Sequence, residues 1–119
     1  MTKVKFCGIT NLKDAISAAE LGADALGFVF YPKSPRFISP KNAKEIIKKL
    51  PPFISMVGLF VNQSKSEVEE VIKDCPLNLL QFHGDENESF CKQYNLPYIK
   101  AISMKSDVDL LKCIQEYNS

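Results

Sequence analysis

Val4-Lys5-Phe6-Cys7, near the amino terminus, alternates between apolar and polar side chains. Leu80-Gln81-Phe82-His83 repeats this alternation in the second half of the chain. Because successive side chains of a β-strand point to opposite faces, each stretch predicts a strand with one apolar and one polar face. A strand of this kind can pack its apolar face on helices while its polar face lines an interior.

Short β-rich runs recur along the chain, and each is followed by an amphipathic stretch with helical spacing. We expect strands at residues 4–8, 25–30, 55–61, 78–83 and 98–103. No low-complexity linker or break in composition divides them, so residues 1–119 are expected to form a single domain. Strict alternation of strand and helix predicts parallel strands joined by right-handed crossovers, since the tight turns of hairpins are absent.

Residues suited to begin a helix precede each amphipathic stretch. The expected starts are Asn11, Ser39 with Pro40, Ser64 with Glu67 in a capping box, Asp85, and Ser106 with Asp109. Gly22 is placed to end the first helix in a left-handed conformation. The chain is expected to stop after a fifth helix, with no strand at Asn118 or Ser119.

Two α/β architectures fit five such units, a doubly wound sheet and a barrel. Central strands of a doubly wound sheet are apolar on both faces, whereas a barrel can hold polar groups inside. The inward set would be Lys5, Cys7, Gln81, His83 and Lys100. We therefore predict a partial (βα)8 barrel of about five parallel strands alternating with helices. Because a complete barrel takes about 250 residues, this chain should not close it, and three further units would be missing.

Composition excludes several classes of function. Fifteen Lys and Arg against fourteen Asp and Glu leave a net charge of +1, which predicts no attraction to nucleic acid or to an anionic membrane. No apolar run approaches the roughly 18 residues of a membrane span, so a cytoplasmic location is expected. The four cysteines form no CxxC pair, which predicts neither a metal site nor a disulfide framework. Cys75, Cys91 and Cys113 are expected on helices as structural thiols.

Catalytic groups of such barrels lie at the carboxyl ends of strands and in the loops that follow. Cys7 precedes Gly8 at the end of the first expected strand, close to a helix start whose dipole could stabilise a thiolate. The alternative is a packing role, since cysteine is a common buried apolar residue. Lys33 and Arg36, in the loop at 31–37, fit a carboxylate or phosphate contact or a solvated basic loop equally well.

Gln81 and His83 are two residues apart and so face the same way near the end of the fourth strand. The pair indicates a binding site, although a lone histidine can also be a hydrogen-bonded structural group. Asn62, after the third strand, fits a plain loop residue. Neither GxGxxG nor GxxxxGK[ST] occurs, and barrels commonly bind phosphate after strands seven and eight, which the chain is not expected to reach.

Four stretches, in order along the chain, resemble the phosphoribosylanthranilate isomerase family of tryptophan biosynthesis. They are residues 5–10 (KFCGIT), 22–30 with 34–36 (GADALGFVF and SPR), 57–62 (VGLFVN) and 80–84 (LQFHG). The resemblance extends over all 119 residues. It implies an isomerase that uses no cofactor and acts on a small phosphorylated aminosugar.

The reaction that the resemblance implies is an Amadori rearrangement of N-(5-phosphoribosyl)anthranilate to the carboxyphenylamino-deoxyribulose phosphate. A general acid opens the furanose ring to an imine, and a general base removes the C2 proton. By resemblance, Cys7 is the base, Arg36 holds the anthranilate carboxylate, and Gln81 and His83 line the pocket. These roles rest on the family motifs and not on spacing alone.

The resemblance also implies what is missing. In the family the general acid is an aspartate at the end of strand six, and the phosphate binds near strands seven and eight. Asp107 and Asp109, expected in the fifth helix, do not match that acid by position. We therefore expect little or no isomerase activity from the 119-residue chain alone.

Two alternatives to an isomerase fragment remain. A non-catalytic barrel fragment or assembly module would use the two open edges of a five-stranded sheet, either to form a homo-oligomer or to pair with the missing carboxyl-terminal half. Mass measurement with and without that half would discriminate between these. A lyase or synthase of a related phosphate-binding barrel is disfavoured, because its glutamate and lysine pattern at the strand ends is not found.

Overall fold

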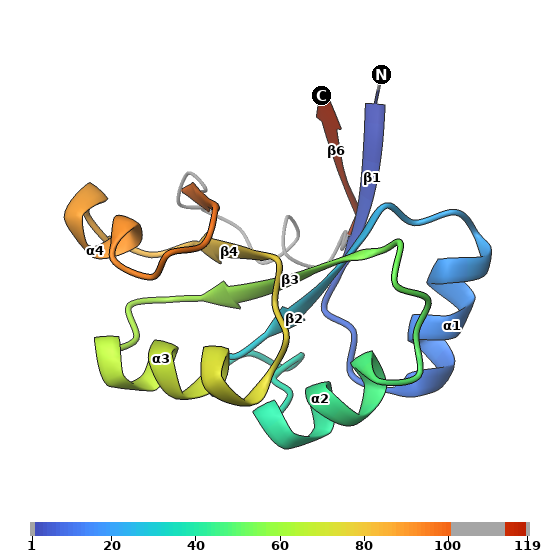
Figure 1. The fold of residues 1–119 in the computed structure, drawn as a ribbon, viewed down its shortest axis with the longest axis horizontal. Coiled ribbons are helices and arrows are strands. Elements are labelled where there is room, and N and C mark those ends of the chain that lie inside the picture. Colours follow the sequence, from blue (N-terminus) through green and yellow to red (C-terminus); the bar gives the residue numbers. More distant parts are fainter. Residues whose placement is uncertain (1, 101–113, 119) are drawn as a thin grey trace.

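A single sheet runs through the computed structural model, which describes residues 2–100 and 114–118 (Figure 1). The strands are β1 Thr2–Cys7, β2 Ala25–Val29, β3 Ser55–Phe60, β4 Leu79–Phe82, β5 Tyr98–Lys100 and β6 Ile114–Asn118. The helices are α1 Leu12–Glu20, α2 Pro40–Ile47, α3 Lys65–Asp74 and α4 Glu88–Lys92. The order of strands is β5-β4-β3-β2-β1-β6, and β1 to β5 pair in parallel with their neighbours.

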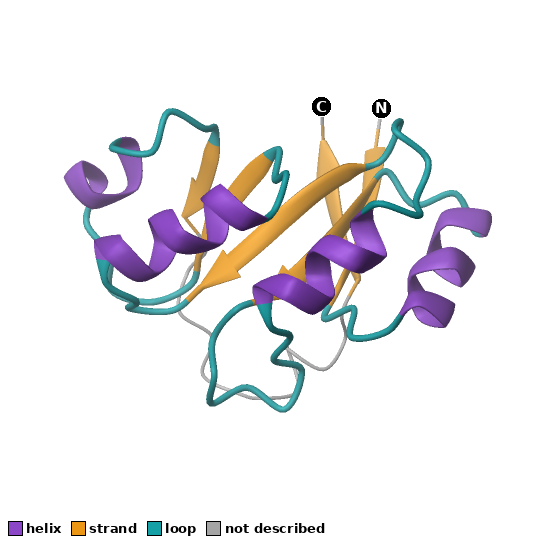
Figure 2. Cartoon of the chain, turned by 60° about the horizontal axis from the view of Figure 1, so that its bottom comes forward, coloured by secondary structure: helices purple, strands orange, loops and turns teal. Residues whose placement is uncertain are grey.

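The four described helices lie on one face of the sheet. Figure 2 shows α1 to α4 in a row in front of the strands. A doubly wound sheet would have helices on both faces, whereas a barrel wall has them only on the outside. The predicted partial (βα)8 barrel is confirmed, and within the described residues the sheet stays open.

One side-chain contact shows that the sheet curls. The Lys5 ammonium on β1 donates a hydrogen bond to the Gln81 side-chain oxygen on β4, although β2 and β3 lie between these strands. Three strand spacings would separate the two backbones by about 14 Å in a flat sheet. The polar face must therefore be concave for the two side chains to meet. We call it the concave face, and the helix-covered face the convex face.

The apolar core fills the convex face. Phe30, Phe60 and Phe82, at the ends of three neighbouring strands, form a row with ring centroids 5.6 Å and 5.9 Å apart. Alanine and branched residues of the helices pack against the same cluster. These helical residues are Ala15, Ala18, Ala43, Ile46, Val68 and Val71. Aromatic side chains bury much apolar area, so this row joins the sheet to its helical layer.

Most of the predicted helix starts are confirmed. Asn11, Ser39 and Ser64 each accept a hydrogen bond from a backbone N–H in the first helical turn, at 2.8, 3.2 and 3.2 Å. Glu67 returns the contact by accepting the Ser64 N–H at 3.0 Å, which completes the capping box. Gly22 ends α1 with φ +89°, as predicted.

The prediction that Asp85 caps the fourth helix is wrong. Asn87 caps α4 and accepts the Phe90 N–H at 2.8 Å. The Asp85 N–H instead donates to the Asn62 side-chain oxygen at 2.7 Å, so Asp85 belongs to the turn before the helix. The predicted start of a fifth helix, Ser106 with Asp109, lies outside the described residues.

The prediction that Asn118 carries no strand is also wrong, because it ends β6. This strand pairs antiparallel with β1, with Thr2 opposite Asn118 and Phe6 opposite Ile114. An edge strand offers unpaired N–H and C=O groups, and β6 fills those of β1. Of the two edges expected to be open, that of β1 is therefore covered.

Candidate active site

The end of β1 places Cys7 beside a glycine of the neighbouring strand. Cys7 pairs with Gly27 of β2, and a Cβ added to Gly27 would lie 3.1 Å from the Cys7 Sγ. A larger residue at position 27 would thus press on the thiol. The backbone N–H groups of Gly8 and Ile9 both donate to the Gly27 carbonyl, at 3.0 and 3.1 Å. These bonds fix the turn that directly follows Cys7.

The loop after β2 brings Arg36 to the same place. The Arg36 N–H donates to the Ser34 Oγ at 3.1 Å, and the Phe37 N–H donates to the Ser34 carbonyl at 3.1 Å. The loop therefore folds back, and the Arg36 side chain lies over Gly8, where an added Cβ would overlap its Cδ. The loop after β2 thus carries Arg36 to the end of β1, against the residue that follows Cys7. Lys33, in the same loop, is exposed.

Lys5 and Gln81 form a buried polar contact on the concave face. Lys5 is 0% exposed and Gln81 is 1% exposed. Burial lowers the pKa of the Lys5 ammonium, and the nearby Cys7 opposes that effect. Lys5 therefore interacts with two of the predicted site residues. It donates a hydrogen bond to Gln81 and interacts electrostatically with Cys7.

His83 follows β4, and its ring is buried on the concave side with Gln81. Its backbone N–H donates to the Phe60 carbonyl at 2.9 Å, whereas neither ring nitrogen has a hydrogen-bond partner among the described residues. Burial, followed by the positive charges of Lys5 and Lys100, lowers the pKa of His83, and Glu86 opposes this. The imidazole is therefore neutral near neutral pH and offers one donor and one acceptor.

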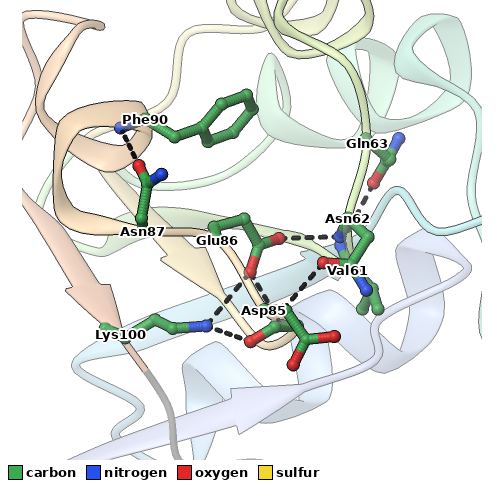
Figure 3. Close-up of polar contacts among 9 residues, drawn as sticks. Val61, Asn62, Gln63, Asp85, Glu86, Asn87, Phe90 and Lys100 are labelled. Carbon is green, nitrogen blue, oxygen red and sulfur yellow. Dashed lines mark hydrogen bonds and ion pairs between the residues drawn. The ribbon is translucent and has the colours of Figure 1, made fainter.

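Directly after His83 along the chain, a group of polar residues gathers around Glu86, which the sequence did not predict (Figure 3). The Glu86 carboxylate accepts the Asn62 N–H at 2.7 Å and the Gly84 N–H at 2.9 Å, and its side chain is 3% exposed. The Lys100 ammonium reaches the same carboxylate at 3.1 Å and also donates to the Gly84 carbonyl. Lys100 was predicted to point inward, but Glu86 carried no sequence signal, because its partners come from three different strand ends.

Glu86 is held as a carboxylate. Burial raises its pKa, but hydrogen bonds from its own N–H, from Asn62, from Lys100 and from Gly84 together bring the pKa below its ordinary value of 4.5. A buried charge is tolerated where several donors surround it. Glu86 therefore carries its charge throughout the neutral range.

The described residues contain no group of three or more His, Cys, Asp or Glu able to hold a metal ion. None of their helices is both long and apolar enough to cross a bilayer. No disulfide joins Cys7, Cys75 and Cys91. Cys91 lies on α4 as predicted, whereas Cys75 is the residue directly after α3; both are buried, and Cys113 lies outside the described residues.

Residues 4–119 match the family model of N-(5'-phosphoribosyl)anthranilate (PRA) isomerase. The chain belongs to this family. The PRA isomerase of Nitrosomonas europaea is 52% identical over 115 residues, which are 97% of this chain and 54% of that protein. That of Nitrosococcus oceani is 50% identical over 118 residues, or 99% of this chain and 57% of its own.

Solved PRA isomerases share the fold. The crystal structure of the enzyme from Thermotoga maritima superposes with a TM-score of 0.84 at 45% identity, covering 94% of this chain and 56% of that one. A PRA isomerase in complex with reduced 1-(o-carboxyphenylamino)-1-deoxyribulose 5-phosphate gives a TM-score of 0.83, covering 94% of this chain and 59% of that one. The chain thus spans about half the length of the curated relatives it matches.

The four residues that the PRA isomerase resemblance singled out lie at or after the carboxyl ends of β1, β2 and β4. Arg36 lies against Gly8, the residue after Cys7, and Gln81 bonds to Lys5. His83 is joined to this group by the charge of Lys5.

Proposed function

We propose that this chain carries the base and the carboxylate-binding part of a PRA isomerase active site. The observation that supports this best is the position of Arg36 against Gly8, the residue that directly follows Cys7. A thiolate that can take a proton and a guanidinium that can hold a carboxylate are two of the groups that the rearrangement of an anthranilate aminosugar requires. The substrate would be N-(5-phosphoribosyl)anthranilate.

The chemistry assigned to Cys7 is removal of the C2 proton. After acid-assisted opening of the furanose ring, the protonated imine makes the neighbouring C2 proton acidic. The Cys7 thiolate takes this proton, and the C2–H electron pair forms the enolamine double bond. Tautomerisation to the ketone completes the Amadori rearrangement without net oxidation or reduction, so no redox cofactor is required.

The other residues would orient the substrate. The planar fork of Arg36 can bind the anthranilate carboxylate through two parallel hydrogen bonds, which a lysine cannot do. The neutral His83 ring and the Gln81 amide would contact sugar hydroxyl groups, each as donor or acceptor. One solved relative binds a reduced carboxyphenylamino-deoxyribulose phosphate, and this supports the substrate class proposed for this chain.

We also propose that residues 1–119 form a single domain, the amino-terminal portion of a (βα)8 barrel, and that the general acid and the phosphate site come from the remaining portion. The proposal draws on the half-length match to the relatives. β5 has only one neighbour among the described strands, so its open edge is where that portion would join, and closing the barrel would also require β6 to leave the edge of β1. A phosphorylated substrate does not cross a bilayer unaided, so we place the reaction in the cytoplasm.

The test is to supply the other half in trans. The carboxyl-terminal part of the Nitrosomonas europaea enzyme would be mixed with the 119-residue chain, and consumption of N-(5-phosphoribosyl)anthranilate measured. The mixture should turn over substrate while the chain alone shows little activity. Cys7→Ser should lower kcat by roughly 10²- to 10⁴-fold, as expected for loss of a general base.

Two controls sharpen this assay. Arg36→Lys should raise KM, whereas Lys33→Ala, which removes an exposed cation from the same loop, should not. Full activity of Cys7→Ser, or robust turnover by the chain alone, would contradict the proposal. An assembly module is the alternative, and it would give a defined oligomer in a mass measurement without the second half.

A further inference from the structure

The Glu86 carboxylate joins the ends of three neighbouring strands. Asn62 follows β3, Gly84 follows β4 and Lys100 ends β5, and all three contact this one side chain. Figure 3 shows the carboxylate between the Asn62 backbone and the Lys100 ammonium. A side chain only 3% exposed that receives three donors holds its surroundings more firmly than an exposed ion pair does.

A second set of contacts ties the turns after β3 and β4 together. The Asn62 side-chain oxygen accepts the Asp85 N–H at 2.7 Å, while Asn62 itself has φ +50°. A Cβ on Gly84 would lie 2.6 Å from that same oxygen, so the two turns are in close contact. The position of one turn is therefore fixed by the other.

His83 lies directly before these contacts. Its own N–H is bonded to Phe60, and both polar groups of the next residue, Gly84, are taken, the N–H by Glu86 and the carbonyl by Lys100. The backbone on both sides of His83 is thus held. His83 is only 8% exposed, and its two ring nitrogens are buried and have no hydrogen-bond partner among the described residues.

We propose that Glu86 and Lys100 form a charge-balanced clamp that positions His83 on the concave face. The role of His83 toward the substrate rests on the proposed function. Glu86 and Lys100 form hydrogen bonds to the Gly84 backbone and none to the His83 ring, so both are positioning residues. Their opposite charges hold the turn, and at the imidazole the effect of Glu86 opposes that of Lys100.

The charges that face His83 support this. Lys5 from β1 and Lys100 from β5 lower the pKa of His83, and Glu86 from the loop after β4 raises it. Removing Glu86 should therefore lower the pKa of His83, and removing Lys100 should raise it. Simple loosening of the turn would admit water and bring the titration back toward the ordinary value, whichever member was removed.

The test is NMR titration of His83 in the untagged 119-residue chain, in which it is the only histidine. Glu86→Gln keeps the side-chain length and removes the negative charge, so the midpoint should fall below that of the wild type. A rise toward the ordinary value, or no change, would overturn the proposal.

Lys100→Met supplies a second variant, which decides the matter even if Glu86→Gln does not fold. Lys100 is 37% exposed, so its removal should be tolerated, and the midpoint should rise. The Asn62 and Gly84 amides should stay protected from hydrogen exchange, since Glu86 still accepts them. An unchanged midpoint, or loss of that protection, would count against a charge-balanced clamp.

Glu88→Gln is the matched control. Glu88 pairs with Lys92 on α4, two residues beyond the clamp, and both side chains are well exposed. This variant should leave the His83 titration unchanged. None of these titrations needs substrate or the second half of the barrel, so their failure and a failure of the isomerase assay are distinguishable.

Discussion

At the scale of single residues, the candidate site depends on side chains whose neighbours are far away in the sequence. Cys7 and Arg36 were predicted from motifs, and the structure adds that Arg36 lies against Gly8, the residue after Cys7. Glu86 could not be predicted, because its role exists only once β3, β4 and β5 lie side by side. Local sequence shows which residues can do chemistry but not which distant ones hold them in place.

His83 should make the stability of the chain depend on pH. Its pKa in the folded chain is below the ordinary 6.5, so the unfolded chain binds more protons as the pH falls through that value. The contribution of the neutral ring is fully present above pH 6.5 and is lost as the pH falls through the folded pKa. Urea unfolding at a series of pH values should show this decline, with a slope of at most about 1.4 kcal/mol per pH unit.

His83→Gln is the control for that decline, since a glutamine has no proton to gain. The variant should have a flatter profile in the window below pH 6.5. An equally steep profile in the variant would show that other groups are responsible. Glu86 titrates in a separate window, because its stabilising charge is present above 4.5 and is lost only as the pH falls through its lower folded pKa.

Two glycines with positive φ allow the Arg36 contact to be measured. Gly22 has φ +89° and open space around it, so Gly22→Ala should cost about 1–2 kcal/mol for the backbone alone. Gly8 has φ +82° and lies under Arg36, so Gly8→Ala should destabilise the chain further and displace the guanidinium. Chemical denaturation of both variants gives the difference, and equal losses would mean that Arg36 moves aside freely.

At the scale of elements, the sequence predicted correctly those helix ends whose capping contacts lie within the helix's own first turn. The caps of α1, α2 and α3 follow from residues within one turn, and these were predicted correctly. The cap of α4 was misplaced because Asp85 is used by Asn62, a residue of another loop. The strand β6 was missed for the same reason, since its partner is the opposite end of the chain.

The capping box of α3 can be tested by one substitution. Ser64→Ala removes the acceptor for the Glu67 N–H and should lower the free energy of unfolding by about 1 kcal/mol. Ser17→Ala, at an exposed position inside α1, is the control and should be neutral or slightly stabilising, because alanine is the better helix former. Equal losses in thermal unfolding of the two variants would contradict a specific capping effect.

At the scale of the whole molecule, chemistry and packing lie on opposite faces of one sheet. The alternation in β1 and β4 predicted this division, and the one-sided helical layer confirms it (Figure 2). The barrel prediction implied that the sheet curls. The buried contact between Lys5 and Gln81, which demonstrates the curl, could not be predicted from the sequence. That contact depends on the distance between strands that are not neighbours.

The rates at which the cysteines are alkylated should show which face of the sheet the helices cover. Cys7 is half-buried on the concave face, whereas Cys75 and Cys91 are each 1% exposed on the convex side. Burial raises the pKa of Cys75 to about 11, which further suppresses its thiolate. Iodoacetamide should therefore modify Cys7 before Cys75 and Cys91 in the native chain, and urea should abolish the difference, as followed by site-resolved mass spectrometry. Earlier modification of Cys75 would show that the helical layer opens readily.

The antiparallel pairing of β1 with β6 puts the two ends of the chain next to each other, since Thr2 lies opposite Asn118 (Figure 1). A short peptide could join them, and new termini could be opened at the exposed Phe53, which precedes β3. Such a circular permutant would convert the pairing of β1 with β6 into a hairpin and make that of β2 with β3 the most distant in sequence. The permutant would fold faster if closure of the β1–β6 pairing limits the rate, and slower if closure of the β2–β3 pairing does.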